Sequence, residues 1–140
     1  MDPALKLAIF RVVEKEPFTG YLQIQLVELA KGYSATEMVY VPELMGNIYD
    51  KAHGGVILTL IDVAFGAACQ TDGTVAVGLN LSVTFIGSPE PGAKLRAEAR
   101  EIGRTEKTLN YDVKVTDQVG GLIAVGSALA YRTGKPVSFL

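Results

Sequence analysis

The sequence predicts an α+β domain in which one long antiparallel sheet wraps around a central helix. Apolar residues are dense from Gly54 to about Thr71 without a proline, as in a buried helix. Strand-like segments separated by short turn-rich breaks lie on both sides of this run. The chain has 140 residues, 49% of them hydrophobic, which suits a single domain over residues 1–140 with one core.

The N-terminal segment predicts a short amphipathic helix from Asp2 to Lys15. Asp2 is a favourable N-cap, and Pro3 suits the first helical position. The apolar residues that follow recur at helical spacing. We therefore treat residues 1–19 as a helical extension that precedes the sheet.

Two strands are expected before the central helix and four after it. The segment Gly20–Gly32 alternates polar and apolar side chains, and Ser34–Leu44 is its expected partner, ended by Pro42. Residues 43–52 are expected to form a loop. Short turns that favour antiparallel hairpins separate the last four predicted strands, which span Val75–Ile86, Ala93–Ile102, Lys107–Thr116 and Leu122–Tyr131.

Composition argues against several classes of function. A net charge of −2 gives no general attraction to nucleic acid or to anionic membranes. Cys69 is the one cysteine, so the sequence supports neither an internal disulfide nor a metal cluster. The N-terminus lacks the features of a signal peptide, and Asp62 interrupts the longest apolar run, which is shorter than the roughly 20 residues that span a bilayer. We expect a soluble cytoplasmic protein without metal, nucleic-acid or membrane partners.

The central helix begins with the single histidine of the chain, His53, followed by Gly54 and Gly55. The first N–H groups of a helix lack internal acceptors, and the helix dipole adds partial positive charge there. Glycines let a ligand approach this backbone closely. Such a helix end can bind an anion or a carbonyl oxygen that becomes negative during a reaction. Alternatively, His53 is only a cap and the glycines only allow tight packing.

A single carboxylate, Asp62, lies within the apolar helix. Its helical neighbours include no basic residue, so burial would be costly and would raise its pKa. It is either a structural residue bonded to loop amides or a general base or nucleophile in a water-poor cleft. Eight residues separate it from Gly54, which is about 12 Å along a helix. If the two act together, two chains must share the site, as antiparallel helices across a two-fold axis allow.

The spacing of Asn47, His53-Gly54-Gly55 and Asp62 resembles the signature of hotdog-fold acyl-CoA thioesterases, above all the phenylacetyl-CoA (PaaI-like) branch. The strand-rich segment downstream is similar to that family, and the resemblance covers roughly Gly20–Arg132. It implies a single hotdog thioesterase domain, acyl-CoA as substrate and no cofactor beyond the CoA of the substrate. It also implies homodimers joined edge to edge, which commonly pair into tetramers.

The same resemblance implies catalytic roles. The N–H of Gly54 would polarise the thioester carbonyl, and Asp62 of the partner subunit would activate water or attack the carbonyl. Asn47 would help to position the water or the carboxylate. His53 would support the loop and the thioester region.

Further positions are implied in substrate binding. Arg104, in a Gly-Arg-Thr turn, matches a region that often meets the nucleotide end of CoA, and Gly55 lies beside the expected carbonyl site. Gly78 stands where many members carry Ser or Thr near the reacting group, and Gly66 where some carry Thr. Both departures remove hydroxyls that could bond the water or the acyl group, so they bear on the acyl group accepted.

Two other functions on the same fold are compatible with the sequence. A non-catalytic acyl-CoA-binding or regulatory module would keep the pocket but would not need Asp62. A hotdog dehydratase or hydratase would need a histidine paired with a carboxylate at the reacting carbon. His53 is the only histidine, and its place at a helix start favours carbonyl polarisation instead.

Overall fold

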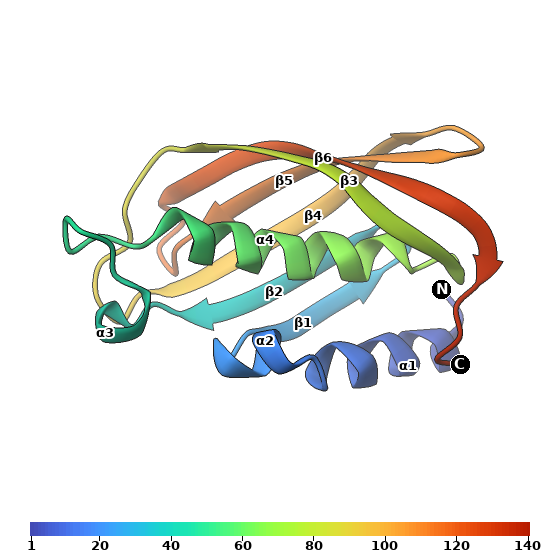
Figure 1. Cartoon of the computed structure of the whole chain (residues 1–140), viewed down its shortest axis with the longest axis horizontal. Helices are drawn as coiled ribbons and strands as arrows, with labels where there is room; N and C mark the ends of the chain where they lie inside the picture. Colours follow the sequence, from blue (N-terminus) through green and yellow to red (C-terminus); the bar gives the residue numbers. More distant parts are fainter.

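The computed structural model describes residues 1–140 and contains one six-stranded antiparallel sheet wrapped around helix α4 (Gly54–Cys69), which confirms the predicted α+β architecture (Figure 1). Across the sheet the strands follow the order β1 (Gln25–Ala30), β2 (Tyr33–Val39), β4 (Lys94–Arg104), β5 (Thr108–Thr116), β6 (Leu122–Pro136) and β3 (Thr74–Phe85).

Helix α4 is fixed on the sheet by apolar packing and by two hydrogen bonds from β2. The Ser34 hydroxyl donates to the carbonyl of Ala64 at 2.5 Å, and the Thr36 hydroxyl donates to the carbonyl of Leu60 at 2.9 Å. These bonds satisfy two hydroxyls that are fully buried in the core. They also fix the rotation of the helix, so that its opposite side, with Gly55, Asp62 and Gly66, stays exposed in the single chain.

The N-terminal helix α1 (Pro3–Glu14) packs beside β1, as Figure 1 shows. Asp2 caps it as expected, because its carboxylate accepts a hydrogen bond of 3.1 Å from the Ala4 N–H. The buried face of α1, with Ile9 at its centre, forms a second apolar cluster with residues of β1 and α4. None of the helices combines the length and the apolar composition that a membrane span requires.

Two predictions for the segments that precede α4 were wrong. Residues from Gly20 do not begin a strand, because Pro17–Tyr21 forms the short helix α2 and β1 begins only at Gln25. Proline at the first helical position favours this turn over the alternating pattern that follows it. Similarly, the predicted loop over residues 43–52 begins with the short helix α3 (Pro42–Met45).

The prediction of successive hairpins after α4 was also wrong at one connection. Strand β3 pairs with β6, whereas β4 lies between β2 and β5. The turn-rich segment after β3 is therefore a crossover and not a hairpin. Strand β6 extends to Pro136, beyond the expected Tyr131, along its pairing with β3. As a result β3 is an edge strand, paired on one side only.

Candidate functional site

The N-terminus of α4 presents one unpaired backbone donor. His53 is the N-cap, and its Nδ1 atom accepts a hydrogen bond of 2.9 Å from the Gly55 N–H. Val56 donates to the His53 carbonyl at 3.0 Å. The N–H of Gly54 has no acceptor within the chain. It is therefore the donor available to a ligand at this helix end.

The aromatic ring of Phe85, at the end of β3, lies against Gly54. A Cβ atom on Gly54 would be 2.9 Å from the Phe85 Cζ atom, so a side chain at this position requires the ring to move. Phe85 is 51% exposed, so its ring forms an outer wall against Gly54. No sequence pattern indicated this residue, because 31 positions separate it from Gly54.

The loop before α4 is ordered by the side chain of Asn47. Its Oδ1 atom accepts hydrogen bonds from the N–H groups of Tyr49, at 2.9 Å, and Lys51, at 3.1 Å. The His53 N–H donates to the carbonyl of the buried Met45 at 2.8 Å, which ties the loop to the core. The Asn47 oxygen is thus engaged within the loop, and its amide nitrogen is the group left to meet a ligand.

The expectation that Asp62 is buried was wrong for the single chain. Its side chain is exposed on the uncovered side of α4, so no loop amides surround it. Apolar neighbours nevertheless remove part of its water shell, and this desolvation, with a smaller contribution from the charge of Glu16, raises the pKa of Asp62. A carboxylate with a raised pKa and no partner is a candidate proton acceptor.

Asp62 lies at a cavity of about 490 Å³ between α1, α4, β3 and the C-terminal residues. Gly66 and Gly78 line the same cavity, so the structure brings Asp62 and Gly78 together. Around Gly66 there is open space, whereas a Cβ atom on Gly78 would lie 3.1 Å from the Phe65 ring. The cavity walls are mostly apolar, which suits the apolar part of a small organic group.

The structure does not bring Gly54 and Asp62 together within one chain. Both lie on the single uninterrupted helix α4, so their separation along the axis is about 12 Å. Asn47, His53 and Gly55 lie with Gly54 at the start of the helix, whereas Gly78 lies with Asp62.

Arg104 lies apart from both groups, near the C-terminal end of α4. It is the last residue of β4, and its guanidinium donates to Glu101 at 2.5 Å and to Asp72 at 3.0 Å. Arg132 donates to the same oxygen of Asp72 at 2.8 Å. The two cations and two carboxylates form an ion-pair cluster. To bind a ligand phosphate, Arg104 would have to leave its carboxylate partners in this cluster.

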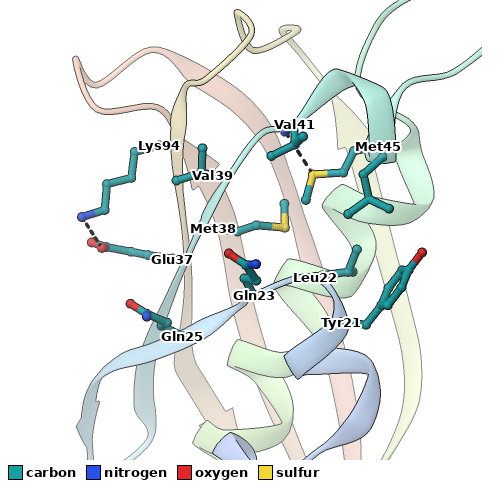
Figure 2. Close-up of a pocket in the computed structure, with 11 residues that line it drawn as sticks. Tyr21, Leu22, Gln23, Gln25, Glu37, Met38, Val39, Val41, Met45 and Lys94 are labelled. Atoms are coloured by element: carbon teal, nitrogen blue, oxygen red, sulfur yellow. Dashed lines mark hydrogen bonds and ion pairs between the residues drawn. The ribbon is translucent and has the colours of Figure 1, made fainter.

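A second cavity, of about 310 Å³, lies between the turn after α2, the end of β2 and α3 (Figure 2). Met38 and Met45 lie beside it, and the Val41 N–H donates to the Met45 sulfur at 3.4 Å. At its rim Lys94 is paired with Glu37 at 2.8 Å. None of the residues predicted for the site lines this cavity, and its charged groups neutralise one another.

Comparisons with known proteins identify the family of this chain. Residues 49–124 match the family model described as the thioesterase superfamily. A protein of Archaeoglobus fulgidus is 33% identical over 114 residues, which cover 81% of this chain and 73% of that protein. The acyl-coenzyme A thioesterase PaaI of Escherichia coli is 25% identical over 125 residues, 89% of each chain.

Solved structures show the same fold. The structure of E. coli PaaI, a protein from the phenylacetic acid degradation operon, superposes with a TM-score of 0.89 and 23% identity over 96% of both chains. A Streptococcus mutans protein, smu.793, solved with bound acetyl CoA, superposes with a TM-score of 0.75 and 30% identity over 81% of this chain and 91% of that one. The sheet wrapped around α4 is therefore the hotdog fold of PaaI.

Proposed function

The chain belongs to the thioesterase superfamily, and on this premise we propose that it hydrolyses acyl-CoA thioesters to the free acid and CoA. The matched segment contains His53, Gly54 and Asp62. E. coli PaaI is named an acyl-coenzyme A thioesterase, and the S. mutans structure holds acetyl CoA, which supports a CoA thioester as the substrate here.

The observation that carries the proposal is the unpaired N–H of Gly54 at the start of α4. In the proposed reaction this N–H binds the thioester carbonyl oxygen and stabilises the negative charge that develops on it. Asp62 of the partner subunit takes a proton from water as the water oxygen attacks the carbonyl carbon. The C–S bond then breaks, and the CoA sulfur leaves as a thiolate that takes up a proton. Direct attack by the Asp62 carboxylate is the covalent variant of the same scheme.

The shared site requires a homodimer, and two features of the chain support one. Strand β3 is an edge strand that exposes apolar side chains, including Val77 and Leu79. The side of α4 that carries Gly55 and Asp62 is also uncovered. Pairing of two β3 edges would cover both features and would place two α4 helices side by side. We propose a dimer of this kind, with further pairing into a tetramer.

The other residues have supporting roles in this scheme. Asn47 orders the loop and offers its amide nitrogen to the water or to the carboxylate, and His53 fixes the start of α4. Gly55 and Gly78 leave room for the thioester and the acyl group. Arg104 binds the nucleotide end of CoA, so Arg104→Ala should raise KM more than it lowers kcat.

Release of free thiol from a panel of aryl, short-chain and long-chain acyl-CoAs tests the proposal. We expect the wild type to hydrolyse at least one class and Asp62→Asn to lose on the order of 10²-fold or more in kcat. The matched control is Asp112→Asn, which changes an exposed aspartate of β5 outside both cavities. Wild-type turnover by Asp62→Asn would overturn the mechanism, and binding of acyl-CoA without turnover by the wild type would favour a binding module.

A further inference from the structure

Two carboxylates and no cationic side chain line the cavity beside α4. One is Asp62, and the other is Glu16, from the turn between α1 and α2. We propose that Glu16 is a positioning residue of the Asp62 site, which tunes the proton affinity of Asp62 from across the cavity. The inference rests on the proposed function, in which Asp62 accepts a proton. It concerns a residue outside the 49–124 segment that matches the family model.

Local structure holds Glu16 in place. It is the N-cap residue of α2, where Pro17 restricts the backbone. The hydroxyl of Thr19, a residue only 2% exposed, donates a hydrogen bond of 2.7 Å to the Glu16 Oε2 atom. This hydrogen bond from a buried donor holds the glutamate carboxylate beside the cavity, although the residue itself is open to solvent. The negative charge is therefore a fixed feature of the cavity.

The cavity gives this charge an effect on Asp62. A nearby like charge disfavours the ionised form of a carboxyl group, and apolar walls reduce the screening between the two. Cys69 is the other titratable group lining the cavity; burial raises its pKa to about 12, so it is neutral when Asp62 titrates. Glu16 is thus the charged group that faces Asp62 from the elements of its own chain. Its charge makes Asp62 a stronger base.

The test measures the pKa of Asp62 directly, by NMR titration of its carboxyl carbon assigned with Asp62→Asn. Glu16→Gln keeps an acceptor for Thr19 but removes the charge. We expect it to lower the pKa of Asp62 by about 0.2 to 0.7 units, the range for partly screened charges. The acid limb of kcat/KM should move to lower pH by the same amount. In about 1 M NaCl the wild-type value should move toward that of the variant.

Glu14→Gln is the matched control, because Glu14 is an exposed glutamate of α1 that does not line this cavity. Thr19→Val should give a smaller downward shift, because it releases the Glu16 carboxylate without removing it. Equal shifts in Glu14→Gln and Glu16→Gln, or no shift in the latter, would overturn the inference. A wild type inactive on every acyl-CoA would overturn the proposed function instead, because the NMR titration needs no activity.

Discussion

The Nδ1 atom of His53 accepts a hydrogen bond of 2.9 Å from the Gly55 N–H, while the N–H of the intervening Gly54 has no acceptor. The imidazole thus satisfies one helix-end donor and leaves the adjacent one for a ligand. Because Nδ1 is an acceptor, the neutral ring carries its proton on Nε2. His53 is therefore a helix cap, and in the proposed mechanism its conformation determines which backbone donor a substrate can meet.

Replacement of His53 separates capping from direct substrate contact. His53→Ala should lower the free energy of unfolding by about 1 kcal/mol, the usual cost of a lost N-cap. His53→Asn supplies another capping acceptor and should keep wild-type stability, with turnover within about tenfold of wild type. Denaturant unfolding and thiol-release assays of both variants check this. A stable but inactive Asn variant would show instead that the imidazole contacts the substrate.

Gly54→Ala should impair catalysis far more than folding. The new Cβ atom would lie 2.9 Å from the Phe85 Cζ atom, so the half-exposed ring must move, and the added methyl group takes up space beside the helix end. Alanine keeps the backbone N–H but crowds the approach to it, so we expect kcat/KM to fall by about 10²-fold, as much as when an oxyanion donor is removed, with a small change in thermal stability. Gly20→Ala is the control, since open space surrounds that position. Unchanged hydrolysis by Gly54→Ala would remove the helix end from the mechanism.

Helical periodicity explains why the arrangement along α4 could be predicted. The apolar run from Gly54 defines one continuous helix, and its fixed rise places Asp62 too far from Gly54 for action within one chain. The exposure of Asp62 could not be predicted in the same way. An apolar helix with one face uncovered in the single chain has the same sequence pattern as one whose faces are all covered by its own chain.

Contacts between segments that are distant in the sequence could not be predicted either. Glu16 and Phe85 come to lie at the two ends of the proposed site only through tertiary packing, so no local pattern identifies either residue. Strand order also depends on tertiary packing. The turn residues after β3 indicate that the chain changes direction, but they do not determine which strand pairs with β3. At α2 the error was local, since the helix-starting Pro17 outweighed the alternation that follows.

The ion-pair cluster near the C-terminal end of α4 predicts a pH-dependent loss of stability. Although burial opposes it, hydrogen bonds from the Thr74 N–H and Arg104, with the charge of Arg132, hold the pKa of Asp72 below its usual range. A lowered folded-state pKa gives stability that is present above the unfolded value, about 3.9, and is lost as pH falls through the folded value.

Asp72→Asn should therefore cost about 1 to 2 kcal/mol at pH 7, because the Asp72 side chain is only 13% exposed and binds two arginines. The difference from wild type should shrink as the pH falls below about 4. Asp117→Asn changes a half-buried turn aspartate that has no arginine partner, keeps the Oδ1 acceptor for the Val119 and Gly121 N–H groups, and provides the comparison. Urea unfolding across this pH range checks the expectation, and a difference independent of pH would contradict it.

Subunit mixing tests whether the site is shared. Gly54→Ala obstructs the proposed carbonyl site and Asp62→Asn removes the proposed base, so each homodimer should be nearly inactive. When the two variants are unfolded, mixed and refolded, random pairing makes about half of the dimers mixed, and each mixed dimer holds one site with both native groups. We expect hydrolysis to recover to about a quarter of the wild-type rate.

Each variant refolded alone is the control and should stay inactive. Recovery would show that Gly54 of one chain acts with Asp62 of the other, as their separation along α4 requires. If mixed dimers form, as shown by mass spectrometry of a tagged partner, and remain inactive, the site does not form between chains.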